Sequence, residues 1–410
     1  MGRTLGSTAF PGLARRWQLL LYIFSIFALF FHFRHKILPN TTSSSSEFQI
    51  KADRSLLTPL PRLAYLISGT KGDVKRIKRL LRAVYHPRCW YLLILDQHAS
   101  DLERLELAKY AKSDFQNVMV AGEADSITDK GPTALASTLH GVAILLQMAP
   151  DWDWFINLSA SDYPLMSQDG TFLRFRIRRR LIKGILADIL HVFSYLPRDL
   201  NFIEHTSDLG WREHQRARPL VIDSGLSDKN KSSLSWAKER RALPFAFKLF
   251  VGSEWLVLTK QFLEFCIWGW DNLPRILLMY YTNYLSSSEG YFHTVICNHR
   301  DYQNTTVNHT LRYQKWGTSP GEMLVPLTSV QFEEMVGSGA LFGRPFREDD
   351  EVLDRLDRLL LGRPDDRLWC SGGKGECLVD SVTPSVNTKR FEKLLVGLLD
   401  ADSFRSTQCK

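Results

Sequence analysis

The sequence lacks the spaced cysteines of a zinc site and the glycine-rich loops that commonly hold phosphate groups. Six cysteines are spread over 410 residues, and no two of them form a C-x2-C pair. A structural zinc ion needs four ligands at short spacings, so a zinc protein is disfavoured. No G-x-x-x-x-G-K-[ST] stretch is present, and Gly69-x-x-Gly72 matches only part of a G-x-G-x-x-G motif. If a nucleotide binds, the loops at strand ends must hold it by other means.

Acidic residues are absent from the most basic segment of the chain, residues 170–187. This segment carries five arginines and one lysine, and removing these six charges lowers the formal net charge from +8 to +2. The excess of positive charge is therefore local. It does not indicate a nucleic-acid-binding domain, whose basic residues are distributed over a whole face or helix.

A long uncharged run stands near the N-terminus, at residues 17–33. Its 17 residues include no Asp, Glu, Lys or Arg, and as a helix they span about 25 Å, enough for a thin bilayer. A cleaved signal peptide is the alternative, but the run is longer than a usual signal core and no small-residue cleavage site follows it. We expect a cytoplasmic tail at residues 1–16, an uncleaved transmembrane anchor at 17–33 and a flexible polar stem at 34–61.

Sequons and cysteines favour a lumenal location for the rest of the chain. The cysteines permit up to three disulfides whose connectivity cannot be read from sequence, and Cys370 with Cys377, around a Gly-rich turn, is the best local pair. A glycan is not expected on Asn157, because this residue lies in a strand that looks buried. The sequons begin at Asn40, Asn157, Asn230, Asn304 and Asn308.

The first half of the chain alternates apolar strand-like runs with helical patterns. Apolar residues recur at helical spacing between Val74 and Tyr85, with Asp73 as a plausible N-cap. This alternation predicts a parallel sheet with helices on its faces. We expect strands at 63–68, 90–95, 118–120 and from 155, and helices at 74–85, 102–110 and 132–147.

Two aspartates follow predicted strands of this sheet. The stretch FINLSASDYPL from Phe155 begins as an apolar run and continues as a polar loop that contains Asp162. Asp96 directly follows the apolar run at residues 90–95. Ligands of open α/β sheets bind outside the carboxyl ends of the strands, which predicts that Asp96 contacts a ribose hydroxyl or a base edge and that the loop of Asp162 is part of a ligand site. The alternative is that both residues only stabilise turns or cap helices.

The second half of the chain is rich in tryptophan and holds one notable glutamate. Residues 201–205 look like a strand, and the region from Trp211 to Trp270 combines aromatic and charged residues. Tryptophan suits stacking on sugar rings, although core packing explains it equally well. Glu289 stands where a Ser-rich loop meets a predicted helix. It either caps that helix or acts as a general base.

Five stretches together resemble the plant branch of glycosyltransferase family 14, the core-2/I-branching group. The resemblance extends over residues 62–395 and leaves residues 396–410 as a C-terminal tail. It implies an α/β fold of the nucleotide-sugar-transferase (GT-A-like) type, with a parallel-core sheet, helices on both faces and a transmembrane helix before it. It also implies inverting transfer from UDP-glucuronate to β-galactan side chains of arabinogalactan proteins, by a single-pass type II Golgi membrane protein. The stretches begin at Leu66, Trp152, Leu200, Lys248 and Ser287.

The resemblance assigns roles to individual residues. Glu289 is implied as the catalytic base, and Pro345 stands where the family places a lysine for the diphosphate. No metal is implied, because Asp151-Trp-Asp153 precedes its strand and lies at the wrong end of it. Lys130 and Arg216 both remain open as the cation for a glucuronate carboxylate. The implied donor-binding residues are Asp96, Asp162, Arg312 and Arg344, and the acceptor-binding residues are Glu204, Trp211, Arg212 and Arg216.

Two departures from the family pattern leave alternatives open. Residues 170–187 interrupt a stretch that the family reads continuously, so they are either an insert, such as a membrane-surface helix, or an unspliced intron. Pro345 and this insert favour a non-catalytic family member that binds glycan or a partner enzyme, whereas the intact Glu289 motif favours an enzyme. A different donor, such as UDP-GlcNAc, is a further alternative.

Overall fold

The computed structural model describes residues 60–122, 125–128, 130–149, 151–167, 173–177, 180–187, 189–228, 231–317, 324–361, 382–384 and 386–409. The predicted tail and anchor, most of the stem and the Cys370–Cys377 pair lie outside these residues. Within the described part of the chain, no helix is both long enough and apolar enough to cross a bilayer.

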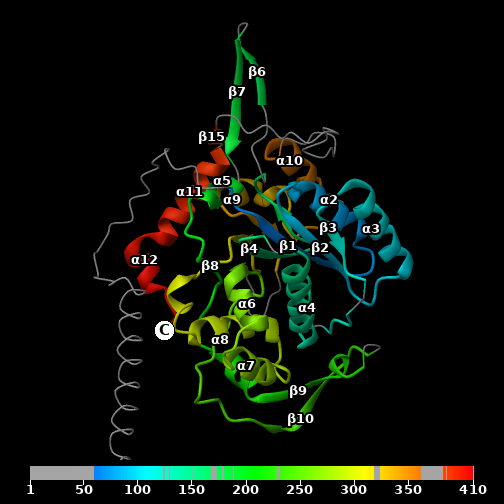
Figure 1. Ribbon diagram of the computed structural model, residues 1–410, viewed down its shortest axis with the longest axis vertical. Coiled ribbons are helices and arrows are strands. Elements are labelled where there is room, and N and C mark those ends of the chain that lie inside the picture. The colour runs from blue at the N-terminus through cyan, green and yellow to red at the C-terminus, as the bar shows by residue number, and fades with distance from the viewer. Residues whose placement is uncertain are drawn as a thin grey trace, which may run out of the picture. The chain divides into compact units, whose positions relative to one another are not determined.

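A seven-stranded sheet forms the centre of the fold, with strand order β12-β8-β11-β4-β1-β2-β3 (Figure 1). The four predicted strands are confirmed, and they pair in parallel. One later strand, β11, runs antiparallel to both of its neighbours, so the complete sheet is mixed around a parallel core. The strands are β1 (Leu63–Gly69), β2 (Trp90–Leu95), β3 (Val118–Val120), β4 (Trp154–Ser159), β8 (Asn201–Phe202), β11 (Val257–Thr259) and β12 (Thr306–Val307).

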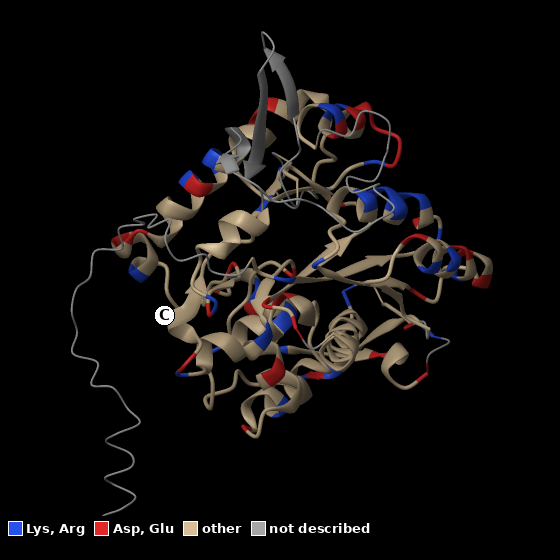
Figure 2. Cartoon of the chain, turned by 45° about the horizontal axis from the view of Figure 1, so that its top comes forward, with Lys and Arg blue, Asp and Glu red and all other residues tan. Residues whose placement is uncertain are grey.

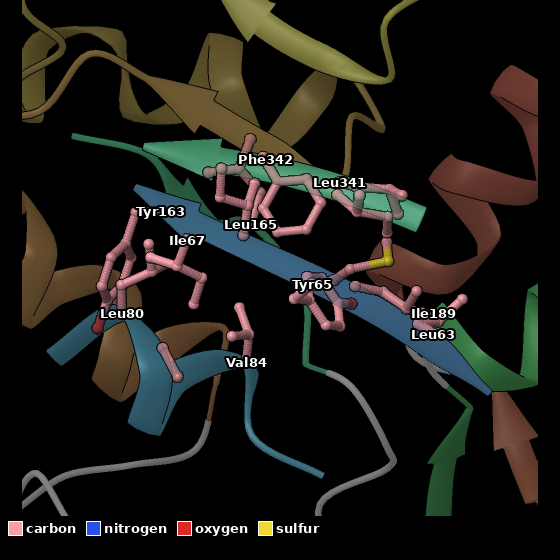
Figure 3. Close-up of a cluster of buried hydrophobic side chains, with 14 of the residues drawn as sticks. Leu63, Tyr65, Ile67, Leu80, Val84, Tyr163, Leu165, Ile189, Leu341 and Phe342 are labelled. Carbon is pink, nitrogen blue, oxygen red and sulfur yellow. The ribbon is translucent and has the colours of Figure 1, made fainter. Parts of the chain in front are cut away.

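Helices cover both faces of this sheet because the parallel strands are apolar on both sides. In β1, Leu63, Tyr65 and Ile67 pack with helix α2 (Val74–Val84), as Figure 3 shows. The alternate residues Ala64 and Leu66 pack in a second core with helix α4 (Thr133–Met148). The predicted helices, including α3 (Asp101–Asp114), are confirmed. Charged residues of both signs lie mostly on the outer helices and loops (Figure 2).

Smaller elements surround this framework. The predicted strand at 201–205 is shorter than expected, and the Asp73 carboxylate binds the Thr70 amide instead of capping α2. The remaining helices are α5 (Ile189–Ser194), η1 (Glu213–Ala217), η2 (Ser224–Leu226), α6 (Lys260–Trp268), α7 (Leu273–Tyr281), η3 (Ser287–Glu289), α8 (Tyr291–Asn298), η4 (Gln303–Thr305), η5 (Ser329–Gln331), α9 (Phe332–Gly337), α10 (Glu351–Leu359), α11 (Val386–Leu399) and α12 (Ala401–Ser406). The remaining strands are β5 (Tyr163–Pro164), β9 (Pro219–Asp223), β10 (Leu234–Arg240), β13 (Arg312–Gln314) and β14 (Phe342–Arg344).

The described residues of the basic segment, 173–177 and 180–187, are extended and not helical. It forms antiparallel strands β6 (Leu173–Ile177) and β7 (Arg180–Ala187), and β15 (Val382–Pro384) pairs in parallel with β7. The membrane-surface helix considered from the sequence is therefore wrong. The reason is visible in LRFRI, where apolar residues and arginines alternate with the period of a strand.

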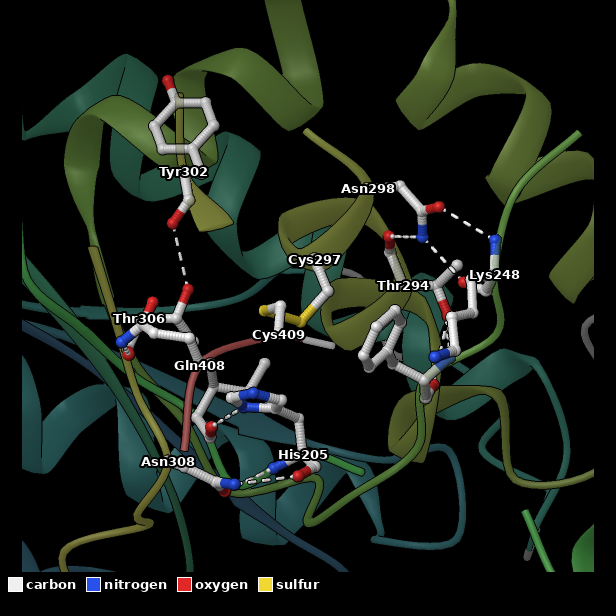
Figure 4. Close-up of a disulfide and its surroundings, with 12 residues drawn as sticks. His205, Lys248, Thr294, Cys297, Asn298, Tyr302, Thr306, Asn308, Gln408 and Cys409 are labelled. Carbon is white, nitrogen blue, oxygen red and sulfur yellow. Dashed lines mark hydrogen bonds between the residues drawn. A yellow bond between two sulfur atoms is a disulfide. The ribbon is translucent and has the colours of Figure 1, made fainter. Parts of the chain in front are cut away.

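A disulfide ties the C-terminal segment to the core (Figure 4). It joins Cys297 in α8 to Cys409, 112 residues later. The Gln408 amide also donates a hydrogen bond of 3.0 Å to the Thr306 carbonyl in β12. The two sulfurs and His205 lie within 4.8 Å of one another. A bonded sulfur pair offers no thiolate to a metal, so this group is a structural crosslink.

Candidate active site

The carboxyl ends of the parallel strands bring the two predicted aspartates to one edge of the sheet. The register pairs Gly69 with Leu95 and Ser68 with Ser159, so β1, β2 and β4 end side by side. Asp96, directly after β2, is buried and accepts hydrogen bonds from the Thr70 hydroxyl (2.9 Å) and the His98 amide (3.0 Å). Its turn-forming role is therefore present in the structure, while contact with a ribose or base stays a prediction.

Asp162 pairs with Arg344 beside a tryptophan. The Asp162 Oδ1 and Arg344 Nε atoms are 3.0 Å apart, in an ion pair without the alignment of a hydrogen bond. Asp162 Oδ2 accepts the Ser159 amide at 2.8 Å, which fixes the carboxylate to the end of β4. The Arg344 guanidinium lies 3.8 Å from the centre of the Trp255 ring. Two of the predicted donor-binding residues are therefore in direct contact.

Arg312 belongs to the same cluster and is more deeply buried than Arg344. It stands on β13 with Arg344 on the paired strand β14, two positions along the register, so both side chains leave the same face of this small sheet. The residue is only 6% exposed and donates to the carbonyls of Asn157 (2.5 Å) and Thr310 (3.0 Å). Burial lowers the pKa of Arg312 to about 10, and nearby Asp162 opposes this shift. Direct contact of Arg312 with a ligand stays a prediction.

Pro345, where the resemblance implies a lysine, contributes backbone hydrogen bonds. Its carbonyl accepts the Leu327 amide at 2.8 Å, and the next amide, of Phe346, donates to the Ser161 carbonyl at 2.9 Å. These bonds hold the 344–346 segment against the loop after β4. The charged side chain that this segment supplies to the cluster is Arg344.

A half-buried glutamate that sequence reasoning missed, Glu254, completes this cluster. Its carboxylate accepts the Ser288 hydroxyl at 3.2 Å, next to Glu289. Burial raises the pKa of Glu254, the like charges of Glu289 and Asp162 raise it further, and Arg344 opposes them. The signal in the sequence was the polar Gly252-Ser253-Glu254 break inside an apolar run. The Asn157 side chain donates to the Glu254 carbonyl and accepts from the Leu256 amide, which fixes this segment to β4. Asn157 is buried, as expected from the sequence.

Backbone hydrogen bonds on both sides fix the loop of Glu289. Ser286 takes a left-handed conformation (φ 57°), and its amide donates to the Lys130 carbonyl at 2.7 Å. The Gly252 amide donates to the Glu289 carbonyl at 2.9 Å. Glu289 closes η3 directly before α8, at the junction predicted from the sequence, and its side chain keeps 31% exposure. It combines a fixed backbone with a solvent-reachable carboxylate, as a general base requires.

One of the predicted acceptor residues, Arg216, contacts this carboxylate, and the other three are linked to Arg216 through neighbouring side chains. Arg216 Nη1 donates to Glu289 Oε2 at 2.5 Å. Arg216 and Arg212 both lie over the ring of Trp211, at 5.1 and 5.0 Å from its centre, and the tryptophan is 52% exposed. Glu204 is an exposed residue, yet partial desolvation of its carboxyl group raises its pKa, with Arg212 opposing. The structure therefore brings all four residues to the neighbourhood of Glu289.

Several polar groups close to Glu289 are buried. His293 is fully buried and binds the Ser253 carbonyl at 2.9 Å, and burial lowers the pKa of His293 to about 3, which keeps the ring neutral. Three buried hydroxyls next to Glu289 in sequence have no hydrogen-bond partner among the described residues. They belong to Tyr284, Ser286 and Ser287.

Asp151 and Asp153 lie at the opposite edge of the sheet, as predicted. They precede β4, whose first residue pairs with the start of β1. The Asp151 carboxylate contacts Arg62, and Asp153 accepts the Arg62 amide (2.8 Å) and contacts Arg198 (3.1 Å). Both aspartates thus anchor the chain at the amino end of the sheet, away from the Glu289 cluster.

Comparisons with known proteins match nearly the whole chain. A family model described as "Branch: Core-2/I-Branching enzyme" matches residues 63–177 and 186–335, a range that includes Glu289 and Arg312 and ends before Arg344. The chain is 57% identical over 392 residues to Beta-glucuronosyltransferase GlcAT14C of Arabidopsis thaliana, covering 94% of this chain and 96% of that protein. Identity to Beta-glucuronosyltransferase GlcAT14A of the same plant is 45% over 434 residues, covering 97% and 93%. Xylosyltransferase 2 of Rattus norvegicus is 28% identical over 356 residues, which is 80% of this chain but 37% of that protein.

Proposed function

The chain belongs to the core-2/I-branching enzyme family, and from this premise we propose that it transfers glucuronate from UDP-glucuronate to β-galactan side chains of arabinogalactan proteins. The names of its relatives from Arabidopsis thaliana support glucuronate as the sugar. The observation that carries the enzymatic proposal is the geometry of Glu289, whose carboxylate is reachable while its backbone is fixed. The parallel core with helices on both faces supports a fold of the GT-A-like type.

Glu289 acts as the general base of a single displacement. Its carboxylate accepts the proton of an acceptor hydroxyl while the oxygen forms a bond to C1 of the sugar. The bond from C1 to the phosphate oxygen breaks at the same time, UDP leaves, and the configuration at C1 inverts. The acceptor lies on the side of Trp211, whose exposed ring offers a stacking surface for a sugar.

The leaving UDP gains negative charge, which the buried arginines neutralise. Arg344 pairs with Asp162 and places its guanidinium over the Trp255 ring. Arg312 lies near the same ring and adds a second positive charge. Fixed charges in a site with little water stabilise a developing anion strongly. No metal ion has a step in this mechanism, and metal-independent transfer is part of the proposal.

We propose further that the protein is anchored in the Golgi membrane by residues 17–33, with the catalytic part in the lumen. The disulfide between Cys297 and Cys409 supports an oxidising compartment. The exposed sequon at Asn304 suits the same location, whereas Asn308 binds the His205 backbone through its side chain.

A non-catalytic family member is the second candidate, and Pro345 is the observation that favours it. Arg344 in the cluster argues against it, because it supplies a cation from the same segment. A transferase that uses another UDP-sugar, such as UDP-GlcNAc, is distinguished by the same experiment.

The test measures transfer by the purified full-length protein from UDP-glucuronate to β-galactan oligosaccharides in the presence of EDTA. Glu289→Gln keeps the size of the side chain and removes the base, so we expect a loss of kcat of about 100-fold to 10000-fold. Glu333→Gln, on the exposed surface of α9, is the matched control and should keep full activity. Product is identified by mass.

The outcomes separate the candidates. Transfer that persists in EDTA and disappears only in Glu289→Gln supports the proposal. Full activity in Glu289→Gln would refute the role of the base, and loss of activity in EDTA would refute metal independence. If neither the protein nor a form without residues 170–187 transfers any UDP-sugar while correctly folded, the non-catalytic reading holds.

A further inference from the structure

The positive charges of the arginines and the negative charges of the carboxylates are equal in number at the site. A negatively charged donor therefore needs cations that can bind it in addition to their present partners. Arg216, Arg312 and Arg344 stand among three carboxylates, those of Asp162, Glu254 and Glu289. A UDP-glucuronate molecule adds a diphosphate and a carboxylate to this site. Each added negative charge needs a cation, because a buried charge without a partner is costly. The diphosphate has Arg344 and Arg312, and the sugar carboxylate needs a separate partner.

Arg216 has the position and the free capacity for this role. It donates one hydrogen bond to another described residue, through Nη1 to Glu289, although a guanidinium carries five N–H groups. The base lies at the reacting carbon, so a cation fixed to the base also lies at the sugar. Two carboxylates in one small site repel each other unless a cation stands between them.

We infer that Arg216 binds the glucuronate carboxylate of the donor while it holds Glu289, and that it thereby selects a donor with a charged sugar. This inference rests on the proposed function. A guanidinium fork matches the planar geometry of a carboxylate and bridges two acceptors, which a lysine ammonium does less specifically. Arg216 is 13% exposed and lies against the Trp211 ring, so its side chain is oriented before a ligand arrives.

Lys130 is the competing cation, and its placement makes it the weaker choice. Its backbone carbonyl accepts the Ser286 amide, so the residue is close to the Glu289 loop, but it is an exposed residue. An exposed ammonium keeps its hydration and contributes little selectivity. Single substitutions of Arg216 and Lys130 distinguish the two assignments, because only the residue that binds the sugar carboxylate should change the preference for UDP-glucuronate.

The test compares the binding of UDP-glucuronate with that of UDP-glucose, which has a CH2OH group in place of the carboxylate. Kd is measured for both donors on the full-length protein by calorimetry, followed by kcat/KM with β-galactan acceptor. In Arg216→Ala, we expect the affinity for UDP-glucuronate to fall at least about tenfold, with the affinity for UDP-glucose changed less than about twofold. Arg216→Lys should recover part of the preference.

Arg212→Ala is the matched control, because Arg212 lies over the same tryptophan ring and is not bonded to Glu289. It should leave the ratio of the two donor affinities unchanged, as should Lys130→Ala.

An equal loss of both donors in Arg216→Ala, or an unchanged ratio, would overturn the inference and leave the proposed function intact. A lost preference in Lys130→Ala would assign the role to Lys130 and also overturn it. If the unmodified protein neither prefers UDP-glucuronate nor transfers glucuronate, the proposed function fails first and the inference fails with it.

Discussion

Replacing Gly252 by alanine tests whether the backbone around Glu289 is as tightly fixed as the hydrogen bonds indicate. A Cβ atom at this position would lie 1.8 Å from the Glu204 carbonyl oxygen and 2.9 Å from the His293 ring. Ordinary contact begins at 3.4 Å, so the two backbone segments must separate by 1.6 Å, the difference between 3.4 and 1.8. The Gly252 amide also donates to the Glu289 carbonyl, so this movement displaces the proposed base directly.

The expected loss is larger in activity than in stability. Overpacking of this kind costs about 1–3 kcal/mol of unfolding free energy. A displacement of the base by about 1 Å lowers the rate about 100-fold. Both quantities are measured on the same preparation, by denaturant unfolding and by initial rates with UDP-glucuronate and β-galactan.

Gly397→Ala provides the matched control. Gly397 lies in α11 with open space where the Cβ would be, so alanine should leave activity unchanged and add up to about 1 kcal/mol of stability. If Gly252→Ala keeps the activity and stability of the unmodified protein, the fixed position of Glu289 argued from this contact is wrong.

Two further predictions concern stability. Burial lowers the pKa of His293 from 6.5 to about 3, so the unfolded chain binds the proton first and stability falls with decreasing pH between these values. From about pH 7.5 to pH 5.5 the unfolding free energy should fall by about 1.4 kcal/mol. Equal pH slopes for the unmodified protein and His293→Gln in denaturant unfolding would contradict this prediction. The Cys297–Cys409 disulfide closes a loop with a sequence separation of 112, and in the chain-entropy account it contributes about 4–5 kcal/mol. Cys409→Ser should therefore unfold at a lower denaturant concentration than the oxidised unmodified protein, and a variant as stable as the oxidised protein would show that the crosslink contributes nothing.

Local patterns in the sequence determined the parallel core and the position of Glu289 at a helix junction. Apolar runs bounded by polar loops predicted β1 to β4, because strands buried on both faces must be continuously apolar. The Ser-rich loop before an apolar helix placed Glu289 at a helix junction, and the structure has it there. Order along the chain also placed Asp151 and Asp153 at the amino end of β4, since they precede it.

Tertiary structure alone decided which charges meet. The ion pairs of Arg216 with Glu289 and of Arg344 with Asp162 join residues that are far apart in sequence. The position of Glu254 depends on β4 and on the loop of Ser288, so no local pattern revealed its contact with the residue next to Glu289. Such contacts follow from how the strands are ordered in the sheet and how the loops pack at its edge. The periodicity of a single segment predicts neither of these.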